Sequence, residues 1–150
     1  MNDGQLNDLV RELCDRSAIT DLVSRLGRWL DEKRFDDTEV LASLFMPDIV
    51  LETPGGKSQG LAAVVDQARR RHTEERTQHV HTNVLIDLDG DRATVEANLI
   101  VTFVPRADAP DIISQVGTRY RFDVARANQG WRFSSIQDRL IWRRREPRAP

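Results

Sequence analysis

Two histidines spaced two residues apart, His79 and His81, are the side chains of this sequence best suited to proton transfer. The ordinary pKa of an imidazole lies near neutrality, so a histidine accepts or donates a proton at working pH. Residues around this pair alternate in polarity as in a β-strand, where positions two apart share a face. The pattern predicts that His79, His81 and Asn83 point to one side of a strand and meet in any cavity on that side.

A histidine that acts as a base needs a partner, and Asp31 is the candidate. A carboxylate bonded to one ring nitrogen fixes the tautomer and stabilises the imidazolium. Asp31 closes the apolar stripe of a predicted helix, at the end where the helix dipole disfavours an acidic residue. This local cost favours a role for Asp31 beyond the helix, while the alternative is a solvated helix end.

A metal site is the weaker interpretation of the same two histidines. Such a site would need His79, His81 and a carboxylate as its three ligands, and no acidic residue lies at a spacing that identifies it as the third ligand. The single cysteine, Cys14, excludes an intramolecular disulfide and a Cys-rich zinc site, and we expect it to be buried in a helix. We therefore expect neither a metal nor another cofactor.

Nucleophilic and phosphate-binding motifs are also missing. Ser134 and Ser135 fall in a predicted strand without a nucleophile elbow, and the glycines at 55, 56 and 60 do not form a phosphate loop. His72, the third histidine, belongs to the charged run 69–76, which is typical of a solvated helix face. We expect His72 at the surface.

Composition sets the class of protein. The 150 residues include 22 Lys and Arg against 24 Asp and Glu, a net charge of −2, which argues against a nucleic-acid binder. The length predicts one domain, residues 1–150, with a core large enough to enclose a pocket. No apolar run approaches the roughly 18 residues that span a bilayer, and the N-terminus does not look like a secretory signal. We expect a soluble cytoplasmic protein that binds neither nucleic acid nor membrane.

The first half of the chain reads as mainly helical. Apolar residues recur at helical spacing over 6–31, with a break at 15–17. Asp15 or Ser17 could cap a new helix there, so the pattern predicts a short helix followed by a longer one. Helices are also predicted over 37–46 and 61–75. Between them lie a short strand, 49–53, and a turn at 54–56.

The second half alternates at period two. Strands are predicted over 79–88, 92–104, 112–125 and 131–142, with a hairpin turn at Asp89-Gly90, a loop over 105–111 and a frayed tail from 144. Helices followed by strands predict an α+β fold with helices on one side of a mostly antiparallel sheet. Strands this long can curve and wrap a cavity.

The order and spacing of several segments resembles the SnoaL-like domain of the nuclear transport factor 2-like superfamily. The similarity covers about residues 10–143. The segments that carry it are 18–22 with Trp29-Leu30-Asp31, 41–50, Gly60, Thr77-Gln78-His79 with Asn83, 89–95, 130–133 and Trp142.

This resemblance implies a cone-shaped α+β barrel, with N-terminal helices on a strongly curved, mostly antiparallel sheet that encloses an apolar pocket. It also implies a homo-oligomer, a dimer or trimer. Members of the scytalone dehydratase, bile acid dehydratase and hexachlorocyclohexane dehydrochlorinase types use an Asp–His pair to remove a proton, and Asp31 and His79 fall on that pair. The implied activity is cofactor-independent proton abstraction from a hydrophobic cyclic substrate, leading to dehydration, another elimination, isomerisation or cyclisation.

The sequence departs from the scytalone dehydratase pattern at two places. Those enzymes carry a second pocket histidine on a later strand, and the matching residues here, 114–120, contain none. Those enzymes also have a tyrosine just before the aspartate, and this chain has Leu30 at that position.

A non-catalytic small-molecule binder or oligomeric scaffold of the same fold is the main alternative to an enzyme, and a subunit resembling the β-chain of ring-hydroxylating dioxygenases is another. The candidate substrate-binding residues are Trp29, Phe45, His81, Asn83, Val101, Phe103 and Tyr120.

Overall fold

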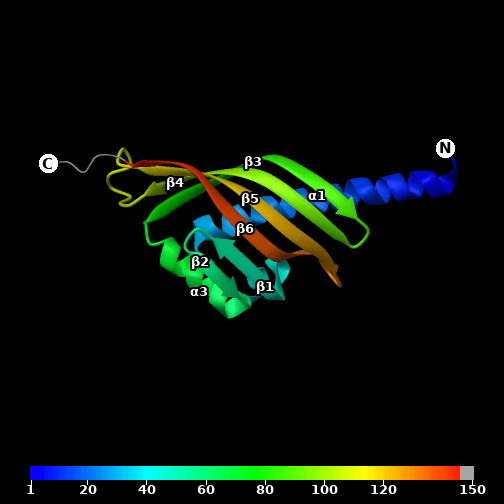
Figure 1. Ribbon diagram of the computed structural model, residues 1–150, viewed down its shortest axis with the longest axis horizontal. Helices are drawn as coiled ribbons and strands as arrows, with labels where there is room; N and C mark the ends of the chain where they lie inside the picture. The colour runs from blue at the N-terminus through cyan, green and yellow to red at the C-terminus, as the bar shows by residue number, and fades with distance from the viewer. Residues whose placement is uncertain (146–150) are drawn as a thin grey trace.

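A computed structural model describes residues 1–145 as three helices and one curled six-stranded sheet (Figure 1). The helices are α1 (Asp3–Glu32), α2 (Thr38–Leu44) and α3 (Leu61–Arg71). The strands are β1 (Phe45–Thr53), β2 (Gly56–Gln59), β3 (Arg76–Asp89), β4 (Arg92–Val104), β5 (Ser114–Ala127) and β6 (Gly130–Arg145).

The strand order is β2-β1-β6-β5-β4-β3, and every neighbouring pair is antiparallel except β1 and β6, which are parallel. The predicted α+β class and mostly antiparallel sheet are therefore confirmed, although the sheet curls without closing, with β2 and β3 at its edges. Helix α1 lies along one face and packs against β3 and β6, while α3 packs against β1 and β2. The hydrophobic core fills the space between these helices and the sheet.

Helix α1 is continuous, so the predicted break at residues 15–17 is wrong. Asp15 does not cap a new helix. It accepts two hydrogen bonds from the Arg126 guanidinium, at 2.9 and 2.8 Å, and a third from Trp131 Nε1 at 3.1 Å. Asp15 therefore links α1 to β5 and β6 and does not end the helix.

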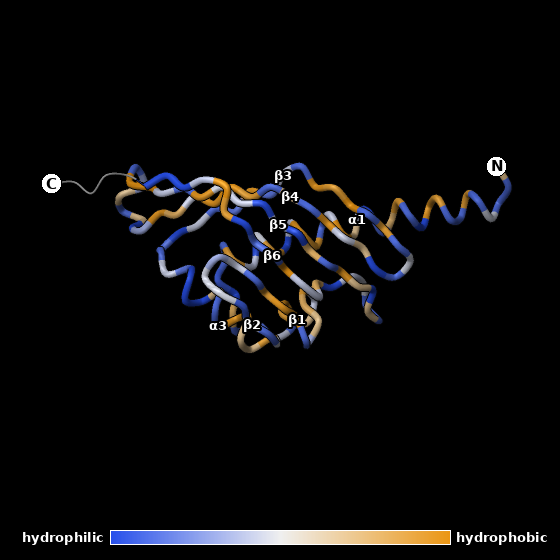
Figure 2. The backbone as a smooth tube through the Cα atoms, in the orientation of Figure 1, coloured by the Kyte–Doolittle hydropathy of each residue, from blue (hydrophilic) through white to orange (hydrophobic). Residues whose placement is uncertain are grey.

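The first turns of α1 project beyond the sheet, toward the N-terminus in Figure 1. Four apolar residues of this segment are exposed, and Figure 2 shows hydrophobic positions along it. They are Leu6, Leu9, Val10 and Leu13. Cys14 is also exposed, contrary to the sequence prediction, because it lies on the same side of the helix as the exposed Ala18, while the next residue, Asp15, faces β5 and β6.

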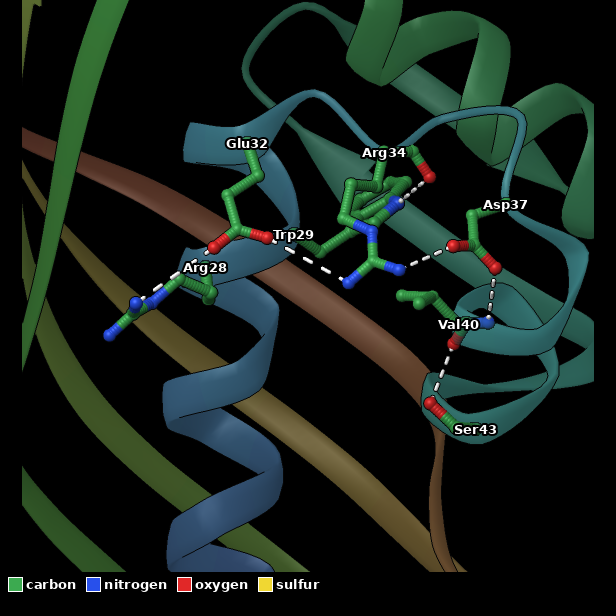
Figure 3. A network of polar contacts seen from close by, with 7 residues as sticks. All are labelled: Arg28, Trp29, Glu32, Arg34, Asp37, Val40 and Ser43. Atoms are coloured by element: carbon green, nitrogen blue, oxygen red, sulfur yellow. Dashed lines mark hydrogen bonds and ion pairs between the residues drawn. The ribbon is translucent and has the colours of Figure 1, made fainter.

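A polar network fixes the chain where α1 ends (Figure 3). Lys33 adopts the left-handed conformation that ends the helix. Trp29 Nε1 donates a hydrogen bond to the Arg34 carbonyl at 3.0 Å, and the Arg34 guanidinium pairs with Asp37. Asp37 in turn accepts from the Val40 N–H and so caps α2. These contacts hold the last turn of α1, which carries Asp31.

Element boundaries differ from the prediction mainly at turns and ends. Strand β2 was not predicted, and the third helix ends at Arg71, before the charged run is complete. Arg144 and Arg145 of β6 pair with Gln115 and Ser114 of β5, so the two arginines are not part of a frayed tail. The rest of that predicted tail, 146–150, lies outside the described residues. No helix within residues 1–145 is both long and apolar enough to cross a membrane.

Candidate active site

Asp31 on α1 and His79 on β3 form a close hydrogen-bonded pair. Asp31 Oδ1 lies 2.6 Å from His79 Nδ1, within the range for general acid–base partners. The carboxylate also accepts the His79 backbone N–H at 3.1 Å and the Thr77 hydroxyl at 2.9 Å. The side chain of His79 is 2% exposed and that of Asp31 is 24% exposed. The structure thus brings together the two residues that the sequence analysis paired.

The three hydrogen bonds keep Asp31 ionised. Burial by itself would raise the pKa of Asp31, but the bonds from the His79 ring, the His79 backbone and the Thr77 hydroxyl outweigh burial and hold this pKa below its usual range. An ionised Asp31 accepts from Nδ1–H and so leaves the lone pair of neutral His79 on Nε2.

Gly27 lets α1 approach β3 closely enough for this pairing. A Cβ at position 27 would lie 3.2 Å from His81 Nδ1 and 3.3 Å from His79 Cβ. Residues 27 and 31 are one helical turn apart and lie on the same face of α1. The missing side chain at Gly27 therefore sets the distance between Asp31 and His79.

His72 joins the pair from the end of α3, although the sequence analysis expected it at the surface. Its Nε2 lies 3.2 Å from His79 Nε2, and its Nδ1 lies 2.7 Å from the Ala68 carbonyl oxygen. Burial lowers the pKa of His72 to about 4. The spacing contained a signal for this position, because Val64, Ala68 and His72 are four residues apart and continue the buried face of α3.

The tautomers of the two rings decide what the contact between their Nε2 atoms can be. His79 Nδ1 donates to the Asp31 carboxylate, and His72 Nδ1 donates to a carbonyl oxygen, because neither acceptor has a hydrogen to give. Two neutral rings would then turn bare lone pairs toward each other at 3.2 Å. A hydrogen bond between the two Nε2 atoms therefore forms only when one of the rings holds a second proton.

The histidine pair opens into a pocket of about 420 Å³ between the sheet and α3, a size that suits a small cyclic molecule. An adjoining apolar hollow of about 50 Å³ shares Arg71, His72 and Tyr120 with this pocket. Three wider hollows, of about 690, 600 and 610 Å³, also lie on the sheet. No histidine of residues 1–145 lines the first two. Asp31, His79 and His81 line the third, which is more open, but Nε2 of His79 faces His72, and His72 lines the pocket beside α3. The pocket lined by both His72 and His79 is therefore the candidate active site. Its main lining residues are Arg71, His72, Glu74, His79, Leu99, Val101, Phe103, Val116, Thr118, Tyr120, Asp138, Leu140, Arg143 and Arg145.

Five of the seven predicted substrate-binding residues lie at this pocket or its apolar extension. Val101, Phe103 and Tyr120 line the pocket, and Trp29 and Phe45 line the extension. His81 and Asn83 line neither. Among residues 1–145, no three His, Cys, Asp or Glu side chains gather in a geometry that could hold a metal ion.

Asn83 is displaced by an irregularity in β3. The register with β4 shifts between Thr82 and Leu85, and Asn83 takes a positive φ of 54°. The shift interrupts the alternation that had placed Asn83 on the same face as His79, and Asn83 is exposed. Asparagine tolerates the left-handed region better than most residues do, which fits its place here.

His81 is packed between α1 and the sheet. Its ring stacks on Tyr120, with centroids 5.6 Å apart and an interplanar angle of 22°, and its Nε2 is buried without a hydrogen-bond partner. Burial lowers the pKa of His81 to about 4. The position of this histidine is thus structural.

We expect His81 to make the fold sensitive to acid. The unfolded chain binds a proton near pH 6.5, whereas folded His81 resists protonation until about pH 4, so stability falls as the pH drops between these values. At pH 5 the loss from this residue is about 2 kcal/mol relative to pH 7. Urea unfolding at both pH values checks it, and His81→Leu should lose less stability than the wild-type protein. An equal loss in both proteins would contradict the prediction.

Comparisons with known proteins identify the fold. The family model of the SnoaL-like domain matches residues 11–137. No curated protein sequence matches the chain. A hexachlorocyclohexane dehydrochlorinase from Novosphingobium barchaimii LL02 superposes with a TM-score of 0.77 at 20% identity, covering 95% of this chain and 96% of that one.

Two proteins of Novosphingobium aromaticivorans are also similar in structure. A scytalone dehydratase-like protein gives a TM-score of 0.78 at 18% identity, covering 92% of this chain and 91% of the other. A protein with a cystatin-like fold, related to nuclear transport factor 2, gives 0.77 at 21% identity, covering 93% and 90%. At these identities the likeness establishes the fold, and the site must be argued from its own residues.

Proposed function

The chain belongs to the SnoaL-like domain family, and from that premise we propose that it is a cofactor-independent enzyme of lyase or isomerase type. Its reaction begins when His79 removes a proton from a hydrophobic cyclic substrate. The observation that carries this proposal is the 2.6 Å contact between Asp31 Oδ1 and His79 Nδ1, because it leaves the lone pair of neutral His79 on Nε2, beside His72 in the wall of the pocket.

His72 supports the base after the proton has moved. While both rings are neutral, their Nε2 lone pairs repel, so no hydrogen bond to His72 competes with a substrate for His79 Nε2. Once His79 holds the substrate proton, the contact at 3.2 Å becomes favourable and stabilises the imidazolium together with Asp31. The protonated base thus has a hydrogen-bond acceptor at each ring nitrogen, Asp31 at Nδ1 and His72 at Nε2.

Tyr120 supplies a hydrogen-bond donor for the negative charge that develops on the substrate. Its ring lines the pocket, and burial raises the pKa of its hydroxyl, so the phenol stays neutral at working pH. A neutral phenol can donate to the oxygen of an enolate, which is the charge that proton abstraction beside a carbonyl creates.

Deuterium exchange tests proton abstraction directly. The purified protein is incubated in D₂O with a panel of cyclic hydroxy-ketones, and NMR measures deuterium uptake at the carbon next to the carbonyl and the appearance of any alkene. Uptake that depends on the protein and on His79 supports the proposal. Binding of a panel member without exchange or turnover would favour the alternative, a non-catalytic small-molecule binder of the same fold.

We also propose that the chain forms a homo-oligomer through the outer face of the sheet. Val80, Ile100 and Trp142 are 45%, 42% and 41% exposed and lie in one row across the strands. The row passes through Gly117, where an added Cβ would lie 2.0 Å from Trp142 Nε1, so the indole covers this position. A contiguous apolar row of this kind is typical of an interface.

Light scattering coupled to size exclusion at micromolar concentration checks the oligomeric state. We expect a dimer or trimer, and we expect Ile100→Lys to shift the population toward monomer because it places a charge in the apolar row. A wild-type protein that elutes only as a monomer would contradict the proposal.

A further inference from the structure

We propose that Asp138 is a second catalytic residue of the pocket, a proton donor to an oxygen leaving group. This inference rests on the proposed function, because it assigns the other half of an acid–base reaction that His79 begins. It narrows the chemistry to elimination of water from a β-hydroxy carbonyl compound.

The first observation is an unpaired carboxyl oxygen inside the pocket. Asp138 lies on β6 and lines the same pocket as His79. Its Oδ1 is buried and has no hydrogen-bond partner, and the Thr118 hydroxyl on β5 is in the same condition. A buried polar atom without a partner costs about 1–3 kcal/mol. The Thr118 hydroxyl is also close enough to act on the Asp138 carboxyl group, so the two oxygens form one polar spot in the wall of the pocket with which a polar group of a ligand can pair.

The second observation concerns the charge state of this carboxyl group. Burial raises the pKa of Asp138, and the nearby Thr118 hydroxyl, Arg71 and His79 only partly offset this effect. The titratable and charged groups that share the pocket are Arg71, His72, Glu74, His79, Tyr120, Arg143 and Arg145. A carboxyl group that keeps its proton can donate it, whereas an ionised one cannot.

The third observation is the placement of the two titratable groups. His79 lies on β3, at one edge of the curled sheet, and Asp138 lies on β6 beside Tyr120, with which it is in register on β5. The curl lets residues of non-adjacent strands line one pocket. When the surroundings of two titratable groups in one site favour different charge states, one group can serve as the base and the other as the acid.

The resulting step balances in protons and electrons. His79 Nε2 takes the proton from the carbon next to the carbonyl, the C–H electrons form the new C=C bond, and the C–O bond breaks. The departing oxygen takes the proton of Asp138 and leaves as water. The enzyme is then left with protonated His79 and ionised Asp138, and transfer of one proton from the first to the second restores it. A halide would leave without this help, so the donor points to a hydroxyl group.

A pair of substrates with different leaving groups tests the assignment. Turnover of 3-hydroxycyclohexanone and 3-chlorocyclohexanone is measured with wild-type protein and with Asp138→Asn, together with deuterium exchange next to the carbonyl. We expect Asp138→Asn to lower kcat for the hydroxy substrate by about 10²-fold. Exchange and the chloro substrate should change less than about threefold. Asp87→Asn, an exposed carboxylate of β3 outside the pocket, serves as the matched control.

Each outcome decides one of the two proposals. Equal loss on both substrates, or no loss on either, overturns the role of Asp138 while exchange by the wild-type protein still supports His79. Absence of exchange by the wild-type protein overturns the proposed function and this inference with it. If Asp138→Asn does not fold, the pH dependence of the wild-type protein decides, because only the hydroxy substrate should lose activity as Asp138 ionises.

Discussion

Replacing His79 with alanine lowers turnover of any substrate found by deuterium exchange by about 10²–10⁴-fold, which is the usual contribution of a positioned general base. Within residues 1–145, Asp31 bonds to Thr77 and His79, and of these two only His79 lines the pocket, so the variant removes the proton acceptor and leaves the other pocket walls in place. Steady-state kinetics and the rate of deuterium uptake should fall together, because both depend on proton abstraction.

Two controls separate a lost base from a damaged fold. Thr82→Ala changes an exposed residue of the same strand and should leave turnover unchanged. Added imidazole should partly restore the activity of His79→Ala, since the deleted ring leaves a space beside the Asp31 carboxylate. Unchanged turnover in a folded His79→Ala protein would remove His79 from the mechanism.

The positions of residues with a local signal could be predicted from the sequence. The strand position of His79 follows from the alternation of β3, and the position of Asp31 follows from the apolar helical stripe that it ends. The catalytic roles of the two residues stay a prediction. Period-two patterning also located the four long strands, because one face of each strand is buried. These features depend on neighbours within a few residues, which is the range over which a single sequence can be interpreted.

Residues whose environment comes from distant segments were missed. Asp15 looked like a helix cap because its partners, Arg126 and Trp131, lie more than 100 positions away. The charged run obscured the role of His72, since the turn that directs it inward depends on where α3 ends against the sheet. Asp138 lies in a strand with no distinguishing pattern, and only the curl of the sheet places it in the same pocket as His79.

Asp31→Asn should lower turnover by about 10²–10⁴-fold although the side chain keeps its shape. All three partners of Asp31 donate: the Thr77 hydroxyl, the His79 backbone N–H and His79 Nδ1. An asparagine offers one oxygen and one NH₂ group, so one of these contacts must become a clash between two donors.

Either orientation of the new amide damages the base. If the NH₂ group faces Nδ1, the ring must carry its hydrogen on Nε2, and the lone pair no longer points into the pocket. If it faces the backbone N–H, the ring keeps its tautomer, but the negative charge that stabilises the imidazolium is gone. Glu32→Gln, one residue further along and outside this set of contacts, removes the same charge and should keep nearly full activity.

A charge-keeping variant, Asp31→Glu, distinguishes this electrostatic role from a packing role. The glutamate keeps the negative charge and changes the reach of the carboxylate, whereas the asparagine keeps the shape and loses the charge. Steady-state kinetics should therefore show more turnover for Asp31→Glu than for Asp31→Asn, and a side chain that only filled space would give the opposite order. An Asp31→Asn protein that keeps its turnover would show that His79 works without a carboxylate partner, and the dyad would have to be abandoned.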